Sequence, residues 1–249
     1  MTQPLSVIVI TLNEETALPK CLGSVSFANE IVVVDSGSKD ATVAIAEQSG
    51  ARVISQSWLG YGPQKQFAVE QARNDWVLCL DADEHLSETL QMSIQDVLQL
   101  PQYQAYQMPR CNRFMGRWLH HGEGYPDMSL RLFNRQYAQW GQQAVHECVE
   151  TREPIGTLQG DLLHESEETR EHYLQKQDRY TTLQAEQLYE QGKQAPWFKL
   201  LLNPVVRFVK FYFIRLGFLD GYAGFSHIMI GCSNTYQKYA KLRKLWRGK

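Results

Sequence analysis

The chain has 249 residues, of which 43% are hydrophobic and 21% charged, and this ordinary globular composition excludes collagen-like, low-complexity and wholly disordered proteins. Its five cysteines are scattered and form no C-x-x-C pair, so neither a disulfide framework nor a structural zinc site is expected. The net charge of -2 is unevenly divided, because residues 193–249 carry eleven Lys or Arg and one acid whereas residues 1–192 carry 14 Lys or Arg and 26 acids.

The chain shows no signal of secretion or of a membrane span. Its N-terminus leads directly into a β-branched apolar run, with no basic segment followed by an apolar signal core. No charge-free apolar run reaches the ~18 residues that a spanning helix needs. We therefore expect a cytoplasmic protein, with an anionic partner surface for its basic C-terminal end.

Strand and helix patterns alternate over the first hundred residues. Apolar, β-branched runs predict strands at 5–11, 30–35, 51–54 and 77–80. Helical patterns follow around 18–25, 41–49 and 64–72, with Gly60–Pro63 as a loop. This alternation is typical of βαβ units, and it predicts an α/β, Rossmann-like fold whose mostly parallel central sheet is flanked by helices.

Polar side chains follow three of these strands, where ligands bind in open α/β sheets. They are Thr11, Asn13 and Glu14 after the first, Asp35 and Ser36 after the second, and Asp81 and Asp83 after the fourth. In an extended chain the carboxylates of Asp81 and Asp83 would lie on one side, where they could share Mg²⁺ or Mn²⁺ with a substrate phosphate. The alternative is a solvated acidic turn that opens the next helix, with Ser87 or Asp83 as its cap.

Two nucleotide-binding motifs are absent from the sequence. No G-x-G-x-x-G follows the first strand and no G-x-x-x-x-G-K-[ST] occurs, which disfavours hydride transfer and P-loop phosphoryl transfer. Further strands are predicted at 104–110 and 129–133. The loop Met115–Pro126 between them holds His120 and His121, whose spacing is not that of a metal site.

Three motifs of the first half carry a family resemblance. Ser-Val-Ile-Val-Ile-Thr-Leu-Asn-Glu at 6–14, Ile-Val-Val-Val-Asp-Ser-Gly-Ser-Lys-Asp at 31–40 and Leu-Asp-Ala-Asp-Glu at 80–84 resemble the nucleotide-sugar half of glycosyltransferase family 2, which has the GT-A fold. Gln64-Lys65, Val-His-Glu at 145–147, Leu-Asp-Gly at 219–221 and Lys-Tyr-Ala-Lys at 238–241 resemble the subgroup of lipopolysaccharide inner-core β-glucosyltransferases.

The resemblance implies a nucleotide-sugar site and a metal site. The donor would be bound by Thr11, Asn13, Glu14, Asp35, Ser36, Lys65 and Asp81. Ser36 stands where the wider family often has a second Asp, which leaves the base less certain. Asp83 would hold Mg²⁺ or Mn²⁺ and His164 would be a further ligand, the alternative for His164 being a capping or hydrogen-bonding role. The alternative for Lys65 is a solvated helix lysine.

The resemblance also implies an inverting transfer of a hexose, glucose from UDP-glucose, onto a heptose of the lipopolysaccharide inner core with a β linkage. Such a transfer needs a carboxylate base near the acceptor hydroxyl. Glu147 is the first candidate and Asp127 the second; Glu123 is a third. Arg110, Arg131 and His146 are acceptor-binding candidates, although Glu147 could instead form a salt bridge with Arg110 or Arg131. Two alternatives stay open. The acceptor could instead be a polyprenyl phosphate or a peptide, or the chain could be a non-catalytic nucleotide-binding module with a membrane tail.

The C-terminal third changes character. Residues 1–165 are expected to form the catalytic domain, with a nucleotide-sugar half at 1–100 and an acceptor half at 101–165, and residues 166–249 a helical extension. Within it, 169–191 is a polar helix, and Asn203-Pro204 looks like the cap and first turn of a new helix.

The apolar stretch 195–218 carries only isolated cations, with Lys199, Asn203, Arg207 and Lys210 on one narrow stripe. This pattern is typical of an interfacial helix, and six more cations follow at 238–249. We expect a peripheral protein on the inner face of the bacterial inner membrane, with a lipid-linked saccharide as acceptor and no nucleic acid partner. The alternative is a helical subdomain packed on the core or on a second subunit.

Overall fold

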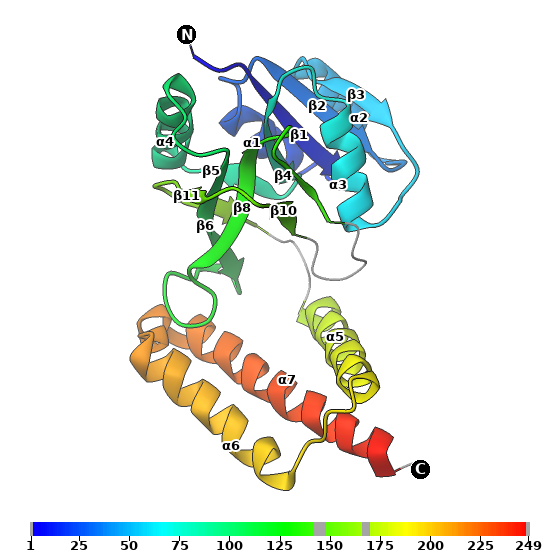
Figure 1. Cartoon of the computed structure of the whole chain (residues 1–249), viewed down its shortest axis with the longest axis vertical. Coiled ribbons are helices and arrows are strands. Elements are labelled where there is room, and N and C mark those ends of the chain that lie inside the picture. Colours follow the sequence, from blue (N-terminus) through cyan, green and yellow to red (C-terminus); the bar gives the residue numbers. More distant parts are fainter. Residues whose placement is uncertain (1, 142–147, 166–169, 248–249) are drawn as a thin grey trace. The chain divides into compact units, whose positions relative to one another are not determined.

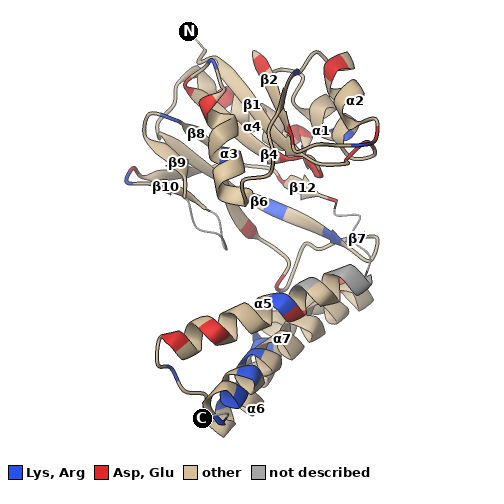
Figure 2. Ribbon diagram, turned by 90° about the vertical axis from the view of Figure 1, so that its right-hand side faces the viewer, with Lys and Arg blue, Asp and Glu red and all other residues tan. Residues whose placement is uncertain are grey.

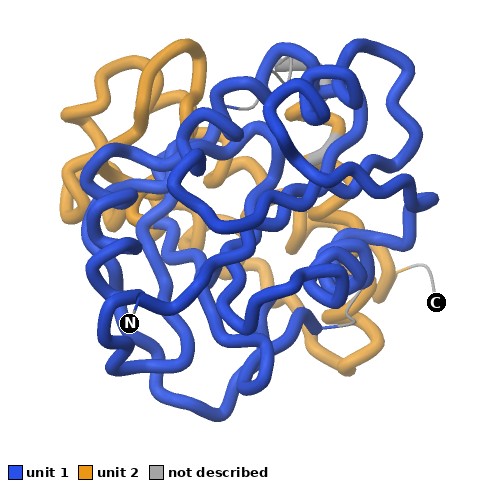
Figure 3. The backbone as a smooth tube through the Cα atoms, turned by 90° about the horizontal axis from the view of Figure 1, so that it is seen from above, with its two compact units in different colours: residues 1–111, 127–165 blue, residues 112–126, 166–249 orange. Residues whose placement is uncertain are grey.

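The computed structural model describes residues 2–141, 148–165 and 170–247, and the chain forms two compact units (Figures 1 and 3). Unit 1 comprises residues 1–111 and 127–165, and unit 2 comprises residues 112–126 and 166–249. The loop between two strands of unit 1 thus belongs to the helical unit.

Unit 1 is built on one mixed sheet with the strand order β3-β2-β1-β4-β8-β6-β12-β5. The strands of the first half are β1 (Leu5–Thr11), β2 (Glu30–Asp35), β3 (Arg52–Ser55), β4 (Trp76–Asp81) and β5 (Glu84–Leu86). Those of the second half are β6 (Ala105–Phe114), β8 (Asp127–Asn134), β9 (Ala138–Trp140), β10 (Val149–Thr151), β11 (Ile155–Thr157) and β12 (Leu162–His164). β9 and β10 form a separate hairpin.

The register of the parallel strands brings three polar strand ends together. β1 lies between β2 and β4 and is parallel to both, with Thr11 opposite Asp35 and Ile10 opposite Asp81. Beyond β4 the sheet becomes antiparallel through β8 and β6. The predicted α/β fold with a central sheet flanked by helices is confirmed, but the sheet is mixed rather than mostly parallel.

Helices cover both faces of this sheet (Figure 1). They are α1 (Leu18–Ser24), α2 (Thr42–Gln48), α3 (Tyr61–Glu70) and α4 (Glu88–Gln99). Alternate residues of β1 enter different cores: Val7 and Val9 pack in the cluster that contains residues of α1, α2 and α4, whereas Ile8 and Ile10 pack in the cluster that contains residues of α3. Burial on both faces explains why the strands read as continuous apolar runs.

Two expectations about local structure in unit 1 were wrong. Gly60–Pro63 is not a loop, because α3 begins at Tyr61; Pro63 lies in its first turn, where a missing N–H breaks no helical hydrogen bond. Asp81 and Asp83 do not lie on one extended segment, because β4 ends at Asp81 and a turn at 82–83 precedes β5. The alternative cap was correct, since Ser87 caps α4 and its Oγ accepts from Leu90 N–H at 3.3 Å.

Unit 2 is a helical assembly. Its elements are β7 (Arg117–Trp118), α5 (Arg170–Glu190), α6 (Trp197–Phe208), the π-helix η1 (Val209–Ile214), the 3₁₀ helix η2 (Gly217–Asp220) and α7 (Gly221–Arg247). α7 packs against both α5 and α6. Arg207 of α6 pairs with Glu123, and a Cβ at Gly231 of α7 would lie 2.6 Å from Glu123 Oε2. A side chain larger than hydrogen at position 231 would therefore displace the carboxylate of this half-buried ion pair.

Asn203-Pro204 does not begin a helix, because Pro204 lies inside α6. The prediction relied on proline at a first turn, but a proline within a helix costs one hydrogen bond and is tolerated when packing compensates. Here Pro204 is half-buried, and its carbonyl accepts from Cys232 Sγ of α7 at 3.3 Å.

The two faces of α6 are arranged opposite to those of an ordinary surface helix. Arg207 points inward to Glu123 and to Thr235 of α7, which its Nη1 reaches at 2.8 Å. The aliphatic side chains of Leu202 and Val206 are 56% and 62% exposed. No helix in the described part of the chain is long and apolar enough to cross a membrane.

Candidate functional site

Two loops at the carboxyl edge of the sheet hold each other through polar side chains. Asp35, which is 4% exposed, accepts from the backbone N–H groups of Gly37 and Ser38 at 2.9 and 3.0 Å. Asn13 accepts from Lys39 N–H at 2.8 Å and donates its own N–H to Ser38 Oγ at 2.8 Å. These bonds show that Asp35 and Asn13 fix the conformation of the two loops that follow β1 and β2.

Other predicted donor-site residues lie at the same edge. Ser36 Oγ accepts from Gln64 Nε2 at 3.2 Å, and Glu14 N–H donates to Thr42 Oγ1 at 2.8 Å. The hydroxyl of Thr11 is buried and has no hydrogen-bond partner among the residues that the structure describes. A buried hydroxyl without a partner is energetically costly, which makes Thr11 an exception among buried polar groups.

Two buried cations converge on Asp81. Lys65 Nζ lies 2.9 Å from Asp81 Oδ1, and Arg131 Nη2 lies 3.1 Å from Asp81 Oδ2. Both cations also face the ring of Trp140, at 4.8 Å for Lys65 and 5.6 Å for Arg131. Lys65 is 3% exposed, so the alternative of a solvated helix lysine is wrong.

Glu84 connects Arg131 and Asp81 to a second ion pair, Arg110 with Asp127. Its side chain is fully buried, and it accepts from Arg131 at 2.8 Å, from Arg110 at 3.4 Å and from Asp81 N–H at 3.0 Å. Arg110 in turn donates twice to Asp127 Oδ2, at 2.9 and 2.6 Å. We call the six residues Lys65, Asp81, Glu84, Arg110, Asp127 and Arg131 the ion network.

Mutual attraction keeps the network charged despite its burial. Burial opposes charge on Asp81, but Lys65 and then Arg131 outweigh it and hold the pKa of this carboxyl well below its usual range. Burial also opposes charge on Arg131, and Glu84 and Asp81 outweigh it, so that the pKa of the guanidinium is raised. The carboxyl edge of the sheet therefore presents fixed, preorganised charges.

Asp83 and His164 form the pair that was predicted to hold a metal. His164 Nε2 lies 3.1 Å from Asp83 Oδ2, and both side chains are 24% exposed. Burial would lower the pKa of His164, but the hydrogen bond and the charge of Asp83 raise it above its ordinary value. β12 and β5 position the pair, because His164 lies opposite Glu84 in their antiparallel register.

This pair fits Mg²⁺ or Mn²⁺ as part of a shared site. Among the described residues, no three His, Cys, Asp or Glu side chains gather where a metal could bind. One carboxylate and one imidazole are nevertheless adjacent, and nucleotide-dependent enzymes usually complete such a site with substrate phosphate oxygens and water. The imidazole favours Mn²⁺ over Mg²⁺, which prefers oxygen ligands.

The structure also reveals residues that the sequence did not single out for the site. Glu84 appeared only as the last residue of the motif at 80–84, with no role of its own, and Trp140 was not considered. Trp140 is 4% exposed and donates its indole N–H to Cys79 Sγ at 3.4 Å, while burial raises the pKa of the Cys79 thiol to about 11. The role of Glu84 arises from contacts with β6 and β8, and that of Trp140 from contacts with α3 and β8.

The remaining candidates fall into three groups. Arg110, Arg131 and Asp127 belong to the ion network, and Arg131 is 5% exposed, with its Nη1 lacking a partner in the described part of the chain. Glu147 and His146 lie outside the described residues. Glu123, the third carboxylate considered as a base, pairs with Arg207 within unit 2.

Comparison with known proteins gives consistent matches. Residues 6–152 match the model of glycosyl transferase family 2. An uncharacterised glycosyltransferase of Rickettsia typhi is 34% identical, over 97% of this chain and 87% of its own length. The lipopolysaccharide core biosynthesis glycosyltransferase LpsC of Rhizobium meliloti is 32% identical, over 96% of this chain and 92% of its own.

Among solved structures, glucosyl-3-phosphoglycerate synthase of Mycobacterium tuberculosis, in complex with Mn²⁺ and UDP-glucose, is 25% identical with a TM-score of 0.39. That match covers 45% of this chain and 44% of the synthase. A TM-score of this size does not establish a shared fold, so the assignment rests on the sequence matches. The chain therefore belongs to glycosyl transferase family 2 and is a glycosyltransferase.

Proposed function

We propose that the chain transfers glucose from UDP-glucose, with inversion and with Mg²⁺ or Mn²⁺, onto a heptose of the lipopolysaccharide inner core, giving a β linkage. The observation that carries this proposal is the convergence, at one edge of the sheet, of two buried cations and an Asp83–His164 pair. A departing nucleoside diphosphate is an anion, and preorganised hydrogen-bond donors and a bound metal are the groups that stabilise it.

The donor would be bound by the loops and the network together. The hydroxyl of Thr11 is buried and has no partner among the described residues, which supports a contact between this side chain and the nucleoside. Asp83 and His164 would hold the metal, which when bound offsets charge on the diphosphate. Lys65 and Arg131, which both pair with Asp81 two residues before Asp83, would stabilise the same leaving group.

We assign the catalytic base to Glu147 rather than to Asp127. Asp127 Oδ2 already accepts two hydrogen bonds from Arg110, which supports a role in holding that guanidinium. Glu147 would take the proton of the acceptor hydroxyl, whose oxygen then attacks the anomeric carbon on the face opposite the departing UDP. His146 would contact the acceptor.

The acceptor is proposed from similarity. The relative LpsC carries lipopolysaccharide core biosynthesis in its name, and its similarity extends over nearly the whole of both chains. A polyprenyl phosphate or a peptide acceptor has no comparable support among the relatives described above.

The test measures transfer and donor binding separately. We expect radiolabelled glucose to pass from UDP-glucose to purified core lipopolysaccharide that ends in heptose, and calorimetry to show UDP binding that strengthens with Mn²⁺. Glu147→Gln should lower turnover by about 10² to 10⁴ while leaving UDP affinity unchanged. Transfer from another nucleotide sugar, with none from UDP-glucose, would overturn the donor assignment.

We further propose that unit 2 lies on an anionic membrane. The outward face of α6 and η1 is apolar, with Leu202, Val206, Phe213 and Ile214 between 55% and 72% exposed. Figure 2 shows Lys and Arg along α7 towards the C-terminus. Exposed apolar side chains with nearby cations suit an interfacial helix, and each cation near anionic lipid contributes about 1 kcal/mol.

Vesicle sedimentation checks this proposal. The intact chain should bind phosphatidylglycerol vesicles more strongly than phosphatidylcholine vesicles, and salt should weaken the binding. The double substitution Leu202→Asp with Val206→Asp should lower binding at least tenfold, because it places two charges on the outward face. Met92→Asp is the matched control, since Met92 is 58% exposed but lies on α4 of unit 1. Equal loss in the control would contradict a specific membrane face.

A further inference from the structure

A groove lies between α5 and α7 of unit 2. Its volume is about 540 Å³, within the usual range for small-molecule sites. Leu174 and Gln177 of α5 line one wall, and Phe114 and Met115 close one end. Neither the ion network nor the Asp83–His164 pair contributes to it.

The opposite wall is a single stripe of α7. Tyr222, Phe225, Met229, Ser233 and Gln237 all line the groove, at spacings of three or four residues. Fifteen residues of helix separate the first from the last, which corresponds to a length of roughly 22 Å at 1.5 Å per residue. The groove is thus long and narrow rather than round.

The lining changes from apolar to polar along this length. Tyr222, Phe225, Met229 and Ile230 give an aromatic and aliphatic first half. Methionine side chains in such a place adapt to chains of varied shape. The apolar half suits a hydrocarbon chain.

The second half offers neutral hydrogen-bonding groups. Asn234 Nδ2 donates to Gln177 Oε1 at 2.7 Å, and Gln237 Nε2 donates to Ser233 Oγ at 3.2 Å. Asp178 is neutralised by Lys241, whose Nζ lies 2.6 Å from Asp178 Oδ1. The described lining contains no Lys or Arg, so a phosphate or carboxylate head has no cation to pair with there.

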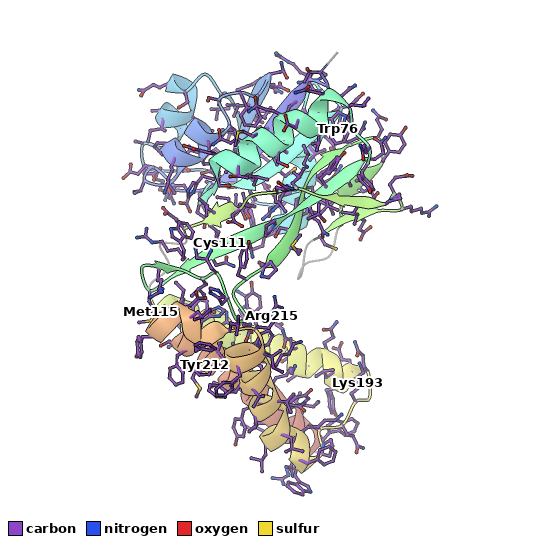
Figure 4. All side chains as sticks on the ribbon, turned by 90° about the vertical axis from the view of Figure 1, so that its left-hand side faces the viewer. Trp76, Cys111, Met115, Lys193, Tyr212 and Arg215 are labelled. Atoms are coloured by element: carbon purple, nitrogen blue, oxygen red, sulfur yellow. The ribbon has the colours of Figure 1, made fainter. Side chains whose placement is uncertain are left out.

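The apolar half adjoins aromatic side chains of α6 and η1. The ring of Phe225 lies 6.4 Å from that of Phe208 and 5.9 Å from that of Tyr212, which is labelled with Met115 in Figure 4. The apolar end of the groove is therefore supported by a cluster of aromatic rings from three helical segments.

We propose that the groove binds one hydrocarbon chain of an amphiphile whose head is neutral and rich in hydroxyl groups, as in a glycolipid. This inference goes beyond the proposed function, because it gives unit 2 a lipid ligand other than the acceptor of the transfer. The amide groups of Gln177, Asn234 and Gln237 would bind hydroxyls of the head, and Phe225 and Met229 would contact the chain.

The experiment is a calorimetric titration of the full chain with dodecyl maltoside below its critical micelle concentration. We expect saturable binding at one site. Ser233→Trp, which fills the groove at an exposed position, and Met229→Gln should each weaken binding tenfold or more. Met92→Gln, at an exposed methionine of unit 1, should leave binding unchanged, and so should Leu202→Asp with Val206→Asp on the membrane face.

Two further probes separate the chain from the head. Maltose alone should show no binding, and dodecylphosphocholine should bind at least fivefold more weakly than dodecyl maltoside. Equal affinity for the phosphocholine compound would overturn the assignment of the polar half, and binding that Ser233→Trp leaves intact would overturn the groove itself. These outcomes do not depend on UDP-glucose turnover, so a failure here is distinguishable from a failure of the proposed transferase reaction.

Discussion

Replacing Glu84 by alanine should lower the free energy of unfolding by about 3–5 kcal/mol, which is the cost of breaking a buried ion pair by removing one partner. Glu84 is fully buried and accepts from Arg131, from Arg110 and from the backbone N–H of Asp81. Without Glu84, the guanidinium of Arg131 keeps Asp81 as its carboxylate partner although it is almost completely shielded from water.

Urea unfolding of four variants, Glu84→Ala among them, measures this effect. Glu84→Gln keeps the shape and one acceptor oxygen and should therefore destabilise less than Glu84→Ala. Glu47→Ala, at an exposed glutamate of α2, should stay within about 0.5 kcal/mol of the unsubstituted chain. Combining Glu84→Leu with Arg131→Met should recover part of the loss, because both buried charges are then absent. A loss below about 1 kcal/mol for Glu84→Ala would contradict the central position of this residue.

The parallel half of unit 1 was predictable because its signals are local. β1, β2 and β4 are short apolar runs that end in polar residues, and their register places Thr11, Asp35 and Asp81 at one edge. A buried parallel strand needs apolar side chains on both faces, so it can be recognised from the sequence as a continuous apolar run.

The ion network was not predictable, because its partners come from distant segments. Glu84 follows two other acids, and such a run normally indicates a solvated turn, yet Glu84 is buried by Arg131 of β8 and Arg110 of β6. Antiparallel pairing of these strands brings the two guanidinium groups beneath the turn. Burial of a charge depends on that tertiary pairing, which no local pattern encodes.

The orientation of α6 shows a similar limit. The polar stripe through Arg207 was visible in the sequence, but an amphipathic pattern does not say which face is outward. The partner that turns Arg207 inward is Glu123, from the segment 112–126, which belongs to unit 2 although it lies between two strands of unit 1.

Replacing Asp83 by alanine should lower glucose transfer by about a thousandfold or more, equivalent to ~4 kcal/mol of transition-state stabilisation. Asp83 is the carboxylate of the pair with His164, and it lies in the turn directly after Asp81. It takes no part in the ion network, so its removal should leave the free energy of unfolding within about 1 kcal/mol of the original. His164→Ala should cost less activity, because a neutral imidazole offsets less of the metal charge than a carboxylate does.

Asp96→Ala is the matched control, because Asp96 is an exposed acid of α4 and lies outside the turn that contains Asp83. Calorimetry then separates binding from chemistry: the strengthening of UDP binding by Mn²⁺ should disappear in Asp83→Ala and persist in Asp96→Ala. If Asp83→Ala keeps both the Mn²⁺ effect and full turnover, the metal is held elsewhere or is not required. If it loses turnover but keeps the Mn²⁺ effect, Asp83 acts on the sugar rather than on the metal, since the two measurements report different steps of one reaction.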